Sequence, residues 1–256
     1  MIFHIPHASQ YIPPEQQAKI VLSSKQLSQE LVEITDWFTD ELFGNHAGAG
    51  DYIVIFPISR LVVDPERFLD DRQEPMAKVG MGVVYTKNSA GETLREPPSA
   101  EERAHLIDMY YRPHHQRLST AVNEELKRDS RSAILDCHSL PSKPLPYELD
   151  QNPDRPDICI GTDDYHTPPL LLAALEGQCR SEGLAYALNR PFSGSIVPLE
   201  HYQTTSNALS VMIEVNRRLY INEKTCEKSA SFDNCRQLVG RMVTVLRAAA
   251  ADRLRL

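Results

Sequence analysis

Short apolar segments rich in β-branched residues alternate with amphipathic segments along this chain, and this alternation is its strongest constraint on the fold. Strands that alternate with helices favour an α/β sheet with helices packed against it. A chain of 256 residues falls within the range that α/β proteins fold around one core, so we expect a single domain, 1–256. The predicted strands are 2–5, 52–57, 61–63, 132–137, 158–160, 184–188 and 208–215, and the predicted helices are 25–43, 99–127, 168–182 and 231–254.

Two long segments, 70–98 and 140–157, are rich in proline and lack a regular hydrophobic period. Long irregular stretches in a compact domain are often functional. The second follows the predicted strand 132–137, so we expect it to cover the carboxyl end of that strand.

The formal net charge of -8 opposes general binding to nucleic acid or to an anionic membrane, because both need an excess of Lys and Arg. A small-molecule partner fits better, and a few arginines in a cleft can still attract an anion. The five cysteines are odd in number and form no CxxC pair, so neither a disulfide framework nor a thiolate zinc site is indicated. With no signal-peptide pattern and no long apolar run, we expect a cytoplasmic protein.

Two histidines, His7 and His138, are predicted at the carboxyl ends of strands, where ligands of open α/β sheets collect. Together with Asp36 they make up the usual protein ligands of a catalytic zinc, which keeps a fourth position for water. Other divalent ions also accept two nitrogens and one oxygen. At this point the alternatives stay open, since the histidines also fit ordinary loop residues and Asp36 also fits a solvent-facing position.

Glu214 lies in the almost wholly apolar run Leu209–Val215. Burial there would raise its pKa toward the range of a general base, although a structural ion pair with an arginine is an equal alternative. Cys137 and His138 are neighbours in a predicted strand and therefore point to opposite faces, so Cys137 is predicted to be a core residue. Asp136 shares a face with His138 and could orient a nearby group.

Arg60, Arg67 and Arg190 are predicted in loops, and a guanidinium is a good bidentate partner for a substrate carboxylate. The neighbours His114 and His115 diverge by about 100° on a helix, so they are predicted to be structural or supporting residues. His4, His46, His105, His166 and His201 show no spacing that indicates a site.

Seven short motifs follow one another along the chain. They are Ile5-Pro-His-Ala-Ser9, Thr35-Asp-Trp37 with Asp40-Glu-Leu, Ser59-Arg-Leu-Val-Val-Asp64 with Arg67, Tyr111-Arg-Pro-His114, Leu135-Asp-Cys-His-Ser139, Asn189-Arg-Pro-Phe-Ser-Gly194 and Ile213-Glu-Val-Asn216. In this order they make the chain resemble the N-formylglutamate amidohydrolase family over about residues 3–220.

The resemblance implies a three-layer α/β fold similar to that of zinc carboxypeptidases (phosphorylase/hydrolase-like), with a central mixed twisted sheet flanked by helices. It also implies one zinc bound by His7, Asp36 and His138. Carboxypeptidases carry a glutamate three residues after the first histidine, and this chain has Gln10 there. Asp36 is therefore the expected acidic ligand.

The activity implied is hydrolysis of the linear amide of a small anionic N-acyl amino acid such as N-formylglutamate. Glu214 is expected to act as general base for a metal-activated water, and Arg60 or Arg67 to hold a carboxylate or the oxyanion. Arg190 with the Ser193-Gly194-Ser195 turn would complete the substrate pocket. The alternatives are another N-acyl amino acid deacylase, a metallopeptidase, or a non-catalytic metal-binding homologue, and a homo-oligomer is left open.

Overall fold

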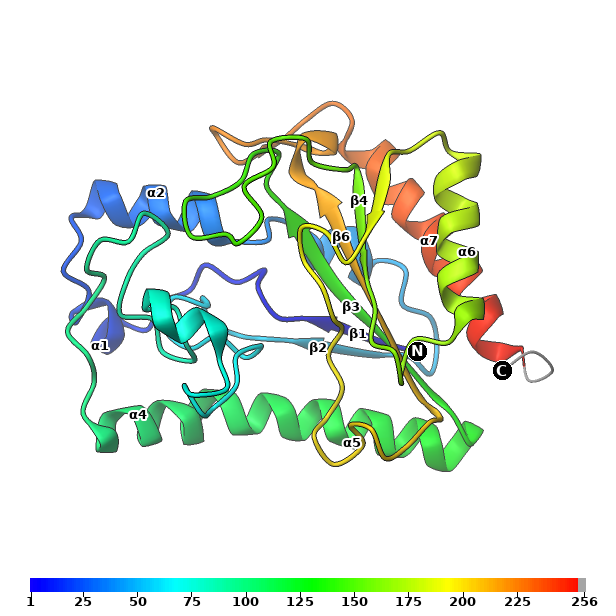
Figure 1. The fold of residues 1–256 in the computed structure, drawn as a ribbon, viewed down its shortest axis with the longest axis horizontal. Helices are drawn as coiled ribbons and strands as arrows, with labels where there is room; N and C mark the ends of the chain where they lie inside the picture. Colours follow the sequence, from blue (N-terminus) through cyan, green and yellow to red (C-terminus); the bar gives the residue numbers. More distant parts are fainter. Residues whose placement is uncertain (253–256) are drawn as a thin grey trace.

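A six-stranded sheet lies between two groups of helices in the computed structural model, which describes residues 1–252 (Figure 1). The order of the strands is β2-β1-β3-β6-β4-β5, and every neighbouring pair is parallel except β4 and β6, which are antiparallel. The predicted mixed sheet flanked by helices is confirmed. The strands are β1 (Ile2–Ile5), β2 (Tyr52–Ile55), β3 (Ser132–Leu140), β4 (Ile158–Gly161), β5 (Tyr186–Leu188) and β6 (Ala208–Asn216), and a separate hairpin holds β7 (Ile221–Asn222) and β8 (Glu227–Lys228).

Alternation of side chains along the strands gives the sheet two buried faces. Residues such as Phe3 and Leu135 point toward one face, while Ile2 and Ile134 point toward the other. The central strands are therefore apolar on both sides, as parallel strands covered by helices are. The helices are α1 (Pro14–Gln17), α2 (Ser24–Ile34), α3 (Thr39–Gly44), α4 (Ala100–Leu106), α5 (Arg112–Asp129), α6 (Pro169–Ser181) and α7 (Phe232–Ala251).

Helix α5 packs against one face, through Leu118, Ala121 and Val122, while α3, α6 and α7 cover the other (Figure 1). A third apolar cluster lies outside the sheet and joins α2 to the segments 56–63 and 81–94. Within the described residues, no helix is both long and apolar enough to cross a membrane.

The predicted helix 25–43 is wrong in one respect, because it is broken into α2 and α3. The break holds Thr35–Phe38, where Phe38 adopts a left-handed φ of 59° and the backbone N–H of Asp36 donates to the carbonyl of His7 at 3.0 Å. A tertiary hydrogen bond thus replaces the helical one, and Asp36 leaves the helix surface for the end of β1.

Other boundaries also differ from the prediction. Residues 61–63 form a turn rather than a strand, closed by the bond from the Val62 N–H to the carbonyl of Ser59 at 3.0 Å, although all three are buried. Strand β3 continues to Leu140, so His138 lies inside it. The helix predicted for 99–127 contains a π-helical turn, Ile107–Tyr111, just before Pro113, which lacks the N–H of a regular turn. For the predicted helix 231–254, α7 ends at Ala251, and 253–254 lie outside the described residues.

Candidate metal centre and active site

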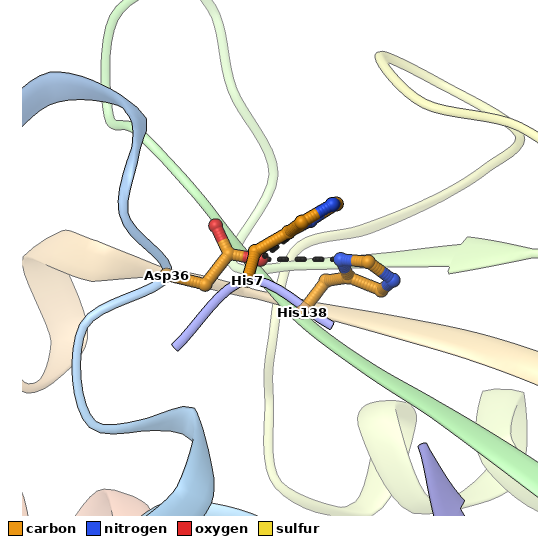
Figure 2. A group of neighbouring side chains, drawn as sticks. All are labelled: His7, Asp36 and His138. Atoms are coloured by element: carbon orange, nitrogen blue, oxygen red, sulfur yellow. Dashed lines mark hydrogen bonds and ion pairs between the residues drawn. The ribbon is translucent and has the colours of Figure 1, made fainter. Parts of the chain in front are cut away.

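Three chain segments bring His7, Asp36 and His138 together at one end of the sheet. His7 follows β1 directly after Pro6, Asp36 lies in the break between α2 and α3, and His138 lies near the end of β3, which pairs with β1. Figure 2 shows both imidazoles beside the carboxylate of Asp36, with dashed lines from one of its oxygens to each ring. The predicted convergence of these residues is therefore observed.

The geometry of this trio fits a divalent metal. Oδ2 of Asp36 lies 3.1 Å from Nδ1 of His138 and 3.6 Å from Nδ1 of His7, and all three residues are at most 3% exposed. Ligand atoms about 2.0–2.1 Å from a tetrahedral zinc are themselves about 3.3 Å apart, so these separations suit one ion. Nδ1 of His7 is also buried without a hydrogen-bond partner among the described residues.

The opposite nitrogens of the two rings contact carboxylates. Nε2 of His7 lies 3.0 Å from Oδ1 of Asp64, and Nε2 of His138 lies 3.0 Å from Oδ1 of Asp136. An imidazole that donates its Nε2–H to a carboxylate keeps an unprotonated Nδ1 and becomes a more basic ligand. In this neutral form, the contacts with Asp64 and Asp136 leave Nδ1 of each ring facing Asp36, as a metal ligand requires.

Asp64 is fully buried and is compensated by two arginines. Arg60 donates to Oδ2 of Asp64 from its Nη2 at 2.7 Å, and Nε of Arg67 lies 3.7 Å from the same oxygen. The Tyr85 hydroxyl donates to that oxygen as well, at 2.5 Å. Burial alone would raise the pKa of Asp64, but the charges of Arg60 and Arg67 hold it well below the ordinary value.

Asp36 has a charged partner of its own in Arg217. Nη2 of Arg217 lies 3.2 Å from Oδ1 of Asp36, and its Nε donates to the hydroxyl of Ser139 at 3.2 Å. Although burial would raise the pKa of Asp36, its contacts with the imidazoles of His138 and His7 lower it. Asp36 is thus held as a carboxylate, the form that binds a metal.

Glu214 is buried on β6, where the strand register places it beside His138 on β3 and Cys159 on β4. Burial raises its pKa to about 8; the charge of His138 opposes this rise, and that of Asp36 adds to it. The alternative structural ion pair is not formed, since within the described part of the chain no salt bridge joins Glu214 to an arginine and its Oε2 has no hydrogen-bond partner. A carboxyl of this kind can exchange a proton near neutral pH.

The residues predicted to form the substrate pocket do not converge as the three candidate metal ligands do. The side chain of Arg190 is 51% exposed and lies 3.3 Å from Asp150, while Ser193 is exposed and the Ser195 hydroxyl contacts that of Ser210 at 2.5 Å. None of the contacts described for these residues reaches the metal trio. Their segment packs on β4 instead.

Gly161 and Gly194 explain that packing. Gly194 has a left-handed φ of 90°, and its carbonyl would be only 2.2 Å from a Cβ placed on Gly161. The neighbouring carbonyl of Phe192 accepts a bond from the thiol of Cys159 at 3.2 Å. The turn therefore lies along β4, next to the residue paired with Glu214.

Several residues of the centre were not assigned from the sequence. Glu66 lies between Asp64 and Arg67 in the sequence, and its Oε2 is 3.2 Å from Nε2 of His138 and 3.7 Å from Nε2 of His7. Arg217 and the His7 partner Asp64 were also not assigned to these contacts. Asp64 belongs to the third sequence motif and Arg217 directly follows the last one, so their positions in the sequence could have indicated a role at the site. No sequence pattern indicates His4, because its partners come from other segments of the chain.

Comparison with known proteins shows which family the chain resembles. The family model for N-formylglutamate amidohydrolase matches residues 1–221. A curated N-formylglutamate deformylase from Pseudomonas putida is 25% identical over 228 residues, which cover 87% of this chain and 82% of that protein.

Two solved structures share the fold. The crystal structure of N-formylglutamate amidohydrolase from Ralstonia eutropha JMP134 matches with a TM-score of 0.80 and 22% identity, covering 97% of this chain and 92% of that chain. A gene product from Agrobacterium tumefaciens matches with a TM-score of 0.67 and 19% identity, covering 97% and 90% of the two chains. With the family model matching most of its length, this chain belongs to the N-formylglutamate amidohydrolase family.

Proposed function

We propose that this chain is a zinc-dependent amidohydrolase that hydrolyses N-formylglutamate to formate and glutamate. The observation that carries the proposal is the convergence of two Nδ1 atoms on one oxygen of Asp36, with the buried carboxyl of Glu214 on the neighbouring strand. The family assignment and the deformylase from Pseudomonas putida support this substrate.

In this proposal His7, Asp36 and His138 hold the metal through two nitrogens and one oxygen, a donor set that suits zinc and also accepts other divalent ions. When bound, zinc would polarise the formyl carbonyl and lower the pKa of a water molecule. The zinc-carboxypeptidase-like centre implied by the family resemblance is part of the proposal, as is the folding of 1–256 as one domain.

Glu214 accepts the proton of the attacking water and returns it to the leaving nitrogen as the C–N bond breaks. Burial raises its pKa to about 8, which brings proton exchange by this carboxyl into the neutral range that a general base uses. Burial beside the metal trio keeps bulk water from exchanging that proton.

Arg60 and Arg67 bind the anionic parts of the substrate or the oxyanion in this proposal. Their side chains are 12% and 18% exposed, so each reaches the surface of the centre while pairing with Asp64. Arg190, with Ser193, Gly194 and Ser195, would border the pocket from the side of β4.

A substrate panel tests the proposal. Purified protein is assayed with N-formylglutamate, N-acetylglutamate and a glutamyl dipeptide, with and without a chelator, while its zinc content is measured. We expect one zinc per chain and chelator-sensitive release of formate. Preference for the acetyl compound or the dipeptide would instead assign another deacylase or a peptidase, and the absence of hydrolysis would assign a binding protein.

A further inference from the structure

A row of buried, hydrogen-bonded side chains runs from helix α5 to the candidate metal ligand His138. Nε2 of His114 on α5 lies 2.8 Å from Nε2 of His4 on β1, and Nδ1 of His4 lies 2.8 Å from Oδ1 of Asp136. The same oxygen lies 3.0 Å from Nε2 of His138. All four residues are at most 3% exposed, so the row is shielded from solvent along its length.

If the rings of His4, His114 and His138 are neutral and Asp136 is ionised, only one arrangement of protons makes every contact in the row a hydrogen bond. His138 and His4 both donate to the carboxylate of Asp136, which leaves Nε2 of His4 as the acceptor of the Nε2–H of His114. Nδ1 of His114 is then unprotonated, and it has no hydrogen-bond partner among the described residues. The backbone N–H of Ile196 donates to the other oxygen of Asp136 at 3.1 Å.

His4, Glu66 and Asp136 also meet the residue requirements of a second cation site. The distance of 2.8 Å between His4 and Asp136 argues against this reading, because it is that of a direct hydrogen bond and is shorter than the roughly 3.3 Å between two ligands of a tetrahedral ion. Nε2 of His4 is already bonded to His114 as well. The group is therefore a hydrogen-bonded support.

We propose that His4 and His114 are positioning residues, which fix the carboxylate of Asp136 and through it the tautomer and orientation of the metal ligand His138. This inference rests on the proposed metal centre and adds two residues to it. Outer hydrogen-bond partners of metal-bound histidines typically change metal affinity by about 10- to 100-fold when removed. A satisfied buried network also fixes a single geometry, which a metal site needs.

Paired substitutions test the role of each histidine. His4→Leu removes the hydrogen bonds of His4 to Asp136 and to His114, whereas His4→Asn keeps an N–H donor at the position from which Nδ1 of His4 faces Asp136. Likewise, His114→Leu removes the donor to His4, and His114→Gln keeps an N–H near the position of Nε2. His166→Leu is the matched control, because His166 is equally buried but bonds to the Ala208 carbonyl and the Gln203 N–H near the far end of β6.

The measurements are zinc affinity by competition with a chromophoric chelator, zinc stoichiometry, and thermal unfolding of the metal-free proteins. We expect the two leucine variants at 4 and 114 to weaken zinc binding about 10- to 100-fold, the asparagine and glutamine variants to restore most of it, and the His166 control to leave it unchanged. Stoichiometry should remain one zinc per chain.

Three results would overturn the inference. The first is that the folded leucine variants bind zinc as tightly as the unsubstituted protein. The second is that the leucine variants lose zinc affinity and the asparagine and glutamine variants do not restore it. The third is that the unsubstituted protein binds a second zinc and that His4→Leu abolishes this binding. If His4→Leu does not fold, the comparison of His114→Leu with His114→Gln decides whether the inference holds. Failure of the unsubstituted protein to bind zinc would instead refute the proposed function itself.

Discussion

Nδ1 of His138 lies 3.1 Å from Oδ2 of Asp36, although 102 positions separate the two residues in the chain. The same carboxylate oxygen faces Nδ1 of His7 at 3.6 Å. Substituting any of the three should therefore reduce metal affinity far more than an equivalent change elsewhere.

His138→Ala and His7→Ala should each lower zinc occupancy from about one per chain to a small fraction, because each removes one of three protein ligands. The measurement is elemental analysis after dialysis against a metal buffer. His201→Ala provides the control, since His201 contacts Thr205 and Asn123 and lies outside the centre. Full zinc content in His138→Ala would rule out its role as a ligand.

Glu214→Gln should retain zinc and lower kcat about 10²- to 10⁴-fold, because the amide keeps the shape of the side chain but cannot accept a proton. Glu30→Gln is a suitable control, since Glu30 on helix α2 is also a buried carboxyl and its hydrogen bonds go to Ser89. Undiminished hydrolysis by Glu214→Gln would remove this residue from the mechanism.

The same substitution should stabilise the metal-free protein, increasingly so as pH rises. The folded pKa of Glu214, about 8, exceeds the ordinary value of 4.5, so the folded state binds more protons than the unfolded state between these values. Burying Glu214 therefore costs progressively more stability from about pH 4.5 to pH 8. Denaturant unfolding of both proteins across this range, with chelator present, should show a widening difference, and a constant difference would contradict the raised pKa.

Asp64→Asn should destabilise the protein by about 3–5 kcal/mol, because it leaves two largely buried arginines without the fully buried counter-charge that they share. Since the folded pKa of Asp64 is depressed, its contribution is present above the ordinary carboxyl pKa and is lost as pH falls below it. Chemical denaturation near neutral and acidic pH measures both effects. A loss of stability that does not shrink in acid would point to packing rather than charge.

Arg67→Lys should raise KM for N-formylglutamate about 10- to 100-fold and change kcat less, because lysine keeps the charge but loses bidentate binding of a carboxylate. Arg67 is the better candidate than Arg60, being more exposed and farther from Asp64. Arg72→Lys, at an exposed ion pair with Asp70, is the matched control. An unchanged KM would exclude Arg67 from substrate binding.

Local sequence patterns were sufficient for the layers of the fold. The runs that became β3 and β6 could be assigned because both sheet faces are buried, so apolar residues point toward each face. Burial of Cys137 and the shared face of Asp136 and His138 followed from the two-residue period of a strand. These features depend on neighbours in the chain, which a sequence displays directly.

The sequence alone therefore determined the α/β architecture and the residue types available for a metal. Tertiary structure alone decided that Asp36 leaves its helix, because the bond from its backbone N–H to the carbonyl of His7 joins segments that no periodicity connects. It likewise decided that His4 lies behind Asp136, through the pairing of β1 with β3. Contacts between distant segments depend on how the strands align, and alignment is set by the packing of the whole sheet.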